Sequence, residues 1–164
     1  MSQTHHAAFE PKFYSTKTFG HDLGLSCCFR QWRATHSHCS LLHGYAIAVS
    51  LEFRGIGLND KNWVVDFGDL GEVKDYLKAT FDHTLLVAED DPELDTLTGL
   101  AGLGLANVIT LPAVGCEAFA AMVGQRVQQW VHDKYGTAVF LEKVEVREHG
   151  ANSAYVKYKH PLSY

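Results

Sequence analysis

Large and small residues alternate along residues 41–54. The alternation places the large side chains on one face of an extended strand and the small ones on the other. The large members are His43, Tyr45, Ile47, Val49, Leu51 and Phe53. This pattern predicts a sheet covered by helices on its small-residue face, and it suits a barrel wall nearly as well. The apolar, β-branched segment 16–33 predicts a second long strand, joined to the first by the polar segment 34–40.

Two further segments have apolar residues at helical spacing. Asp69, with Glu72 three residues later, forms a capping-box pattern that predicts the start of a helix continuing to Phe81. The segment from Glu117 to Tyr135 predicts a second helix, because its apolar residues recur every three or four positions and a glycine follows it.

Residues 140–148 and 154–158 predict two more strands around a turn at 150–152. The resulting ββααββ order predicts an α+β fold, with a four-stranded antiparallel sheet and two helices on one of its faces. The segment from residue 87 begins with acidic residues and continues as a Gly/Leu/Ala stretch, so we expect it to be a surface excursion.

Length and composition fit one globular domain. The chain has 164 residues, of which 46% are hydrophobic and 20% charged. We expect a flexible N-terminal arm over 1–15 and a single domain over 16–164. The formal charge of −5 argues against a nucleic-acid partner, and no apolar run approaches the length of a membrane span.

Cysteine and histidine usage indicate the compartment and the place to look for chemistry. Cys27, Cys28, Cys39 and Cys116 form no Cys-x-x-Cys pair, so a disulfide framework is improbable. Residues 1–12 also lack the pattern of a secretion signal, and we therefore expect a cytoplasmic protein. Three of the ten histidines, His36, His38 and His43, fall within eight residues.

Five short segments resemble the motifs of one family, in the same order and with similar spacing. Cys39 with Leu42-His43-Gly44 resembles C-x-x-L-H-G-H, and residues 63–70, W-V-V-D-F-G-D-L, resemble W-V-I-D-F-x-x-L. The remaining matches are Asp82-His83 to L-D-H, residues 112–117 to a P-T-S-E helix start, and Arg147-Glu148 to a late K-E or R-E pair. The family is that of 6-pyruvoyl- and 6-carboxy-tetrahydropterin synthases, and the resemblance covers residues 18–158.

The resemblance implies a tunnelling fold, in which the sheets of three subunits close into a barrel and two trimers stack into a hexamer. It implies a homo-oligomer with sites between subunits, which would also cover exposed strand edges. Relative to the family, residues 87–108 are an insertion. The implied activity is that of a carbon–oxygen lyase acting on 7,8-dihydroneopterin triphosphate or a related dihydropterin, in pterin or deazapurine biosynthesis such as the tetrahydrobiopterin or queuosine routes.

The resemblance also implies roles for single residues. Cys39 matches the catalytic base, and Asp82 matches the residue that orients the proton-transferring His83. Glu148 matches the anchor that accepts two N–H bonds from the edge of the pterin ring. Glu117 matches a second ring contact, although an acidic residue in a first helical turn also serves the helix dipole. Because adjacent side chains rarely bond to each other, we expect the partners of Asp82 and His83 on a neighbouring subunit or strand.

The implied zinc site departs from the family pattern. Family members bind zinc through three histidines, but Phe29 and Tyr45 stand at two of those positions and only His43 is retained. A rebuilt site from His36, His38 and His43 is the alternative, although we favour solvated, inert loop histidines.

Two main functional hypotheses therefore remain, beside a weaker third, a related tunnelling-fold activity on a different 2-amino-4-oxo ring. The first is a tetrahydropterin-synthase-like lyase that uses Cys39, Asp82 and His83. The second is a catalytically degenerate paralogue that binds a pterin or purine-like ligand without turnover, motivated by Phe29 and Tyr45.

Overall fold

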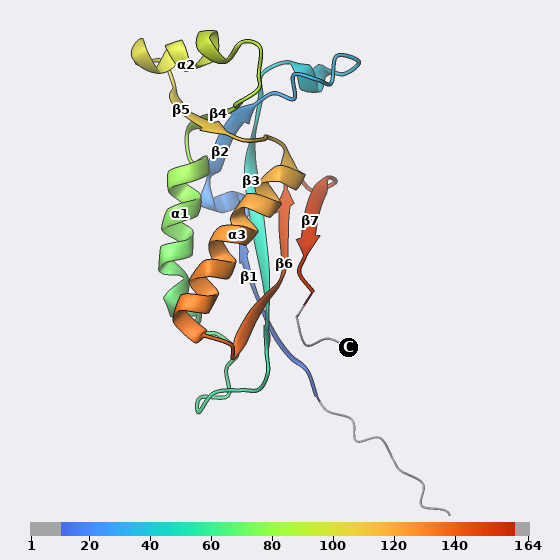
Figure 1. The fold of residues 1–164 in the computed structure, drawn as a ribbon, viewed down its shortest axis with the longest axis vertical. Coiled ribbons are helices and arrows are strands. Elements are labelled where there is room, and N and C mark those ends of the chain that lie inside the picture. The colour runs from blue at the N-terminus through green and yellow to red at the C-terminus, as the bar shows by residue number, and fades with distance from the viewer. Residues whose placement is uncertain (1–10, 160–164) are drawn as a thin grey trace, which may run out of the picture.

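The computed structural model describes residues 11–159, so most of the predicted N-terminal arm lies outside the described residues. One sheet of seven strands contains every described strand, in the order β5-β4-β2-β3-β6-β7, with β1 also paired to β3 (Figure 1). The strands are β1 (Phe13–Phe19), β2 (Leu25–Phe29), β3 (His43–Gly55), β4 (Thr84–Ala88), β5 (Asn107–Leu111), β6 (Val139–Arg147) and β7 (Ser153–Lys157). The helices are α1 (Gly71–Phe81), α2 (Leu94–Gly102) and α3 (Cys116–Tyr135).

Strand β3 is the central strand of the sheet and pairs with three others. Its second half pairs with β1 and its first half with β2, both antiparallel and on the same edge, while β6 pairs along the other edge. The prediction of one strand over 16–33 was therefore wrong. A short 3-10 helix at His21–Leu23 and the left-handed Gly24 (φ 78°) separate β1 from β2, and β1 already begins inside the segment predicted as an arm.

Helices α1 and α3 pack against the large-residue face of β3, not its small-residue face as the sequence pattern suggested (Figure 1). Ile47, Val49, Leu51 and Phe53 on that face are almost fully buried, because they meet the apolar stripes of the two helices. The predicted α+β class is confirmed. The predicted count of four strands was wrong, because β1 and β2 are separate and β4 and β5 are additional.

The segment after α1 is not an irregular excursion. Strand β4 pairs parallel to β2, β5 pairs parallel to β4, and α2 crosses between them. Leu85 and Val87 pack against α2 in a second cluster, whereas Leu86 and Ala88 belong to the main core. Because neighbouring strand residues face opposite sides, α2 covers the face opposite α1 and α3, so the helices do not all share one face.

The start of α1 differs from the predicted capping box. A 3-10 turn over Phe67–Leu70 precedes the helix, and the Asp66 carboxylate accepts the Gly68 N–H at 2.9 Å. Asp69 instead accepts a hydrogen bond from the Tyr135 hydroxyl at 3.0 Å and pairs with Lys134 at 3.1 Å. Asp69 thus ties the start of α1 to the end of α3. No helix among residues 11–159 has the length and apolarity needed to cross a membrane.

An ion pair anchors the connection between β2 and β3. Arg30 donates from Nε to Asp91 Oδ2 at 2.8 Å and from Nη2 to Oδ1 at 2.5 Å, and the Asp91 side chain is only 1% exposed. These contacts hold the pKa of Asp91 below its usual value, mainly through the Arg30 hydrogen bonds. The Gln31 N–H then donates to the Cys39 carbonyl at 2.7 Å. The Arg30–Asp91 ion pair and this backbone hydrogen bond, together called the loop clamp, therefore fix both ends of the loop that carries Cys39.

Replacing Phe119 tests the packing between the helices and the sheet. Its ring is fully buried, 5.1 Å from the Phe29 ring and 5.3 Å from the Phe81 ring. We expect Phe119→Ala to lower the free energy of unfolding by about 3–5 kcal/mol, because it leaves a cavity. Urea denaturation measures the loss. The exposed control Phe67→Ala should lower the free energy of unfolding by less than about 1 kcal/mol. Equal losses in the two variants would contradict this account of the core.

Replacing Asp91 tests the loop clamp. Asp91→Asn should lower the free energy of unfolding at pH 7 by about 2 kcal/mol, because it leaves Arg30 with a neutral partner. The folded-state pKa of Asp91 is depressed, so its contribution is present above the unfolded pKa and disappears as the pH falls through the folded one. Between about pH 5 and pH 2, the free energy of unfolding should therefore fall less steeply in Asp91→Asn than in the original chain. The exposed control Asp75→Asn should keep the original pH profile.

Candidate functional site

Three rings meet where β2 ends and β3 begins, at the edge of the hydrophobic core. The β2–β3 ladder sets Phe29 directly opposite His43, and Tyr45 lies two residues further along the same face. The ring centroids are 5.2 Å apart for Phe29 and His43, 5.5 Å for His43 and Tyr45, and 6.3 Å for Phe29 and Tyr45. We call these three residues the aromatic corner. They are the positions that correspond to the three zinc ligands implied by the family resemblance.

Tyr45 lies among the acidic groups of the candidate site. Burial raises the pKa of its hydroxyl, and the nearby charges of Glu148, Cys39 and Cys116 raise it further. The ring of His149 lies 5.9 Å from the Tyr45 ring on another side. Cys39 and Glu148, which are far apart in the sequence, therefore both lie near enough to Tyr45 to raise its pKa.

Glu148 follows β6 and continues the face of Val144 and Val146, both of which are fully buried. Glu148 itself is half-buried, and its backbone N–H donates to the Asn152 carbonyl at 3.1 Å, across the turn into β7. Its carboxylate lies close enough to Cys116 to raise the pKa of that thiol. An acidic group thus stands at the open end of an otherwise apolar face, beside the aromatic corner.

Cys116 and His149 were not selected from the sequence as site residues. Cys116 is the first residue of α3, where burial and the negative charge of Glu148 raise its thiol pKa to about 12. A thiol with so high a pKa stays protonated and donates rather than attacks. The sequence feature that could have identified them is their position, because Cys116 precedes Glu117 and His149 follows Glu148.

Cys39 lies on a 3-10 turn over His38–Ser40, and its side chain is exposed. Its backbone N–H donates to Ser37 Oγ at 3.2 Å, which holds the turn closed. Glu117 is exposed in the first turn of α3, where its charge favours the helix N-terminus.

Asp82 and His83 contact each other directly. Asp82 Oδ1 and His83 Nδ1 are 2.6 Å apart, which corrects the expectation that adjacent side chains would not pair. The pairing is possible because His83 adopts a left-handed backbone conformation (φ 55°). The carboxylate fixes the imidazole orientation and leaves Nε2 for another partner.

The Asp82–His83 pair lies on the other side of the sheet from Glu148. The His83 side chain is 87% exposed and lines a hollow of about 460 Å³. The walls of this hollow include Ser26, Gly44 and Ala46, and Cys27 and Tyr45 also border it. Those three residues alternate with Cys27 and Tyr45, so they occupy the small-residue face. Within one chain, Cys39 and Glu148 both act electrostatically on Tyr45, whereas His83 is exposed beside the small-residue face.

The histidine-rich loop does not assemble a metal site in the described chain. His36 and His38 are exposed and line an open hollow of about 620 Å³ with Ser37 and Ser40. His43 Nδ1 instead donates to the Leu41 carbonyl at 2.7 Å. Within residues 11–159, no three His, Cys, Asp or Glu side chains converge as metal ligands would.

The family's zinc ion does not fit the aromatic corner. Phe29 has no donor atom and is 3% exposed, with its ring packed on Phe119. Tyr45 ligates a metal only as a phenolate, and its raised pKa keeps the hydroxyl protonated near neutral pH. His43 alone supplies an imidazole, whereas a zinc site of this kind needs three protein ligands.

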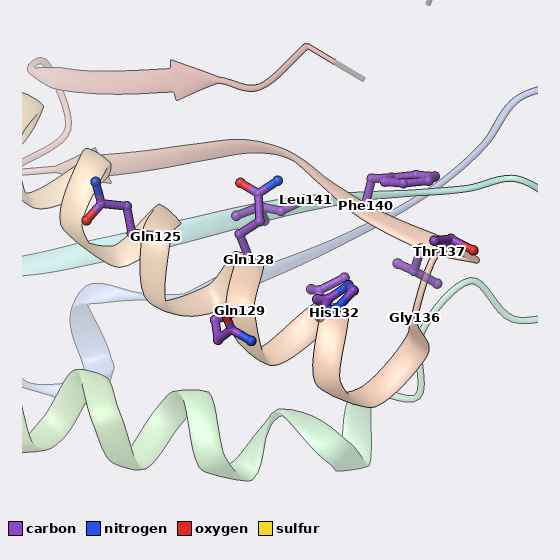
Figure 2. A pocket seen from close by; sticks show the side chains of 10 residues that line it. Gln125, Gln128, Gln129, His132, Gly136, Thr137, Phe140 and Leu141 are labelled. Atoms are coloured by element: carbon purple, nitrogen blue, oxygen red, sulfur yellow. The ribbon is translucent and has the colours of Figure 1, made fainter. Parts of the chain in front are cut away.

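Another hollow, of about 480 Å³, lies between the C-terminal half of α3 and the start of β6. Figure 2 shows Gln125, Gln128, Gln129 and His132 along the helix, with Gln128 directed toward Leu141 on the neighbouring strand. None of the residues selected from the sequence lines it. It is therefore separate from the candidate site.

Comparison with known proteins agrees with the observed fold. An uncharacterized protein from Wolinella succinogenes superposes with a TM-score of 0.77 at 18% identity, covering 92% of this chain and 100% of that chain. The 6-pyruvoyl tetrahydropterin synthase of Plasmodium falciparum gives 0.61 at 18% identity, covering 90% and 98% of the two chains. That of Caenorhabditis elegans gives 0.58 at 16% identity, covering 91% and 96%. No curated protein matches the sequence.

These superpositions show the shared fold, and the sequence itself shows the family. Residues 21–160 match the profile of 6-pyruvoyl tetrahydropterin synthase, which is most of the chain. The match spans the aromatic corner, the Asp82–His83 pair and Glu148. The chain therefore belongs to the 6-pyruvoyl tetrahydropterin synthase family.

Proposed function

We propose that the chain is a carbon–oxygen lyase that acts on 7,8-dihydroneopterin triphosphate or a related dihydropterin, in pterin or deazapurine biosynthesis. Family membership supports a tetrahydropterin-synthase-like function. The observation that carries the finer proposal is the half-buried Glu148 carboxylate at the open end of the apolar face of β6. A carboxylate in this place accepts two parallel N–H bonds from a 2-amino-4-oxo ring, and the surrounding apolar side chains strengthen both bonds by excluding water.

The proton-transfer groups are proposed to be Cys39 and His83. In an elimination, one group removes a proton from a side-chain carbon while the neighbouring carbon–oxygen bond breaks and triphosphate leaves with the electron pair. Cys39 is proposed as the base, since it lies near Tyr45 and hence near the ring anchor. His83, held by Asp82 at 2.6 Å, is proposed to shuttle the proton through its other ring nitrogen.

The placement of these groups supports a site shared between copies of the chain. Glu148 and the turn residue Cys39 both lie near Tyr45, whereas His83 is exposed beside Ser26, Gly44 and Ala46 on the small-residue face. One chain therefore presents the two halves of a site in different directions. We propose a homo-oligomer, a trimer or hexamer, in which His83 of one copy completes the site of another. With its free cysteines, we propose a cytoplasmic location.

A second function is favoured by the aromatic corner. With Phe29 and Tyr45 in place of two imidazoles, the aromatic corner lacks the three imidazole ligands that would hold a Lewis acid to stabilise an enolate. The second proposal is therefore a paralogue that binds a pterin or purine-like ligand without turnover. Incubation with 7,8-dihydroneopterin triphosphate separates the two. Triphosphate release supports the lyase, and ligand binding without release supports the paralogue.

Replacing Glu148 tests the ring anchor. We expect Glu148→Gln to weaken the binding of 7,8-dihydroneopterin by about 10- to 100-fold, because an amide accepts the paired N–H groups less strongly than a carboxylate does. Fluorescence titration measures the affinity. The control Glu142→Gln makes the same change six residues earlier on β6 and should leave binding unaltered. Equal affinity in the chain with and without Glu148→Gln would refute the anchor and the proposed function.

Mixing two inactive variants tests the shared site. If turnover is observed, Glu148→Gln and His83→Ala should each abolish most of it. Subunits of the two variants, unfolded and refolded together, should regain about a quarter of the original activity, since one in four shared sites then holds both groups by random assortment. Mixing Glu148→Gln with a chain carrying both substitutions should restore none. No recovery in the first mixture would place the whole site within one chain.

A further inference from the structure

We propose that the aromatic corner is a metal-free part of the ligand site, in which the Tyr45 hydroxyl, rather than a metal ion, binds an oxygen of the ligand held by Glu148. The inference rests on the proposed function for the identity of the ligand. The claim that the aromatic corner needs no metal does not depend on the proposed function. The tests below separate these two claims.

The backbone of the corner retains the spacing of a three-ligand cradle. Three imidazoles bound tetrahedrally to one zinc ion at about 2.0–2.1 Å would have ring centroids roughly 5 Å apart. The observed centroids of Phe29, His43 and Tyr45 are 5.2, 5.5 and 6.3 Å apart. This spacing follows from the ladder, because Phe29 lies opposite His43 and Tyr45 follows on the same face. The side chains have changed, but the strand geometry that would bring three ligands together is present.

The side chain at position 29 now belongs to the core. Phe29 is 3% exposed, and its ring meets Phe119 edge to face at 5.1 Å. An apolar ring packed in this way closes the inner side of the corner. Any ligand group that enters the corner must therefore be bound by the other two side chains.

His43 and Tyr45 are the polar groups left to contact a ligand. His43 donates from Nδ1 to the Leu41 carbonyl at 2.7 Å, so Nε2 is the ring nitrogen left to contact a ligand. Within residues 11–159, the Tyr45 hydroxyl has no hydrogen-bond partner, although the side chain is half-buried and close to Glu148 and Cys39. An unpaired phenol beside the ring anchor is suited to donate to a hydroxyl or carbonyl oxygen on the ligand's side chain.

Direct titration with Zn²⁺ tests the metal-free state of the corner. The full chain is treated with EDTA, desalted and titrated with Zn²⁺, in parallel with His43→Ala. The chain has ten histidines, so the difference between the two proteins isolates the corner from other weak sites. We expect the same zinc stoichiometry and affinity for both. One tightly bound zinc ion per chain that is lost in His43→Ala would overturn the proposal.

Restoring the missing ligands tests the cradle. The double variant Phe29→His/Tyr45→His should gain one zinc ion per chain, with an affinity at least about 100-fold above that of the original chain, and His43→Ala should abolish the gain. Because Phe29 is buried, Tyr45→His alone is measured as well. It leaves the core intact, and its two imidazoles should bind Zn²⁺ about tenfold more tightly than the original chain does. If folded Tyr45→His gained no zinc affinity, the ring spacing would not be that of a cradle.

The role of Tyr45 is tested with 7,8-dihydroneopterin in the presence of EDTA. The original chain should bind it equally well with and without the chelator, and Tyr45→Phe, which keeps the ring but removes the hydroxyl, should bind it about fivefold more weakly. Loss of binding in EDTA, or equal affinity in Tyr45→Phe, would overturn the inference while leaving the Glu148 anchor intact. If the original chain binds no pterin in either condition, the proposed function and the Tyr45 donor both fall. In that case the zinc titration still tests whether the aromatic corner binds a metal ion.

Discussion

The register between β2 and β3 is the constraint on which the candidate site depends. It sets Phe29 opposite His43 and Cys27 opposite Tyr45, so that one face of the ladder carries the aromatic corner and the other carries Ser26, Gly44 and Ala46. A shift of one residue would exchange the two faces completely. The buried side chains of β3 oppose such a shift, because it would expose Ile47 and Val49 to water. The hydrophobic core therefore holds the site in register.

The second determinant is the placement of β6 on the other edge of β3. Val49 pairs with Val146, so the apolar faces of the two strands join beneath α3, and Glu148 emerges just beyond the last buried valine. The start of α3 then brings Cys116 against the carboxylate. Hydrophobic packing thus determines where an acidic group stands, and the low polarity around that group makes its hydrogen bonds to a ligand stronger than they would be in water.

Sequence reasoning reached the family and the residue types, but several local structures differ from it. The patterns of α3, β6 and β7 were predicted within one or two residues, because their periodicity is strong and Gly136 stops the helix. The prediction of one strand over 16–33 was wrong because β-branched composition does not reveal the break at Gly24. Strand β4 was missed because a short apolar run that is buried on both faces of a parallel sheet shows no alternation. Strand β5 was missed because this five-residue edge strand is mostly unburied and has no strong apolar pattern. The Asp82–His83 contact was missed because it requires an unusual backbone angle at His83.

The amino-acid sequence by itself determined the chemistry that is present: one retained histidine, a phenylalanine and a tyrosine at the other two positions, and an acidic residue at the end of a β pattern. It did so because residue types and strand periodicity are local properties. Only the tertiary structure decided which of these groups meet. Cys39 and Glu148 converge around Tyr45, while His83 lies on the opposite face of the sheet, because strand pairing across long sequence separations assigns each side chain to a face. Those pairings depend on how the whole core packs, and no short segment of sequence encodes them.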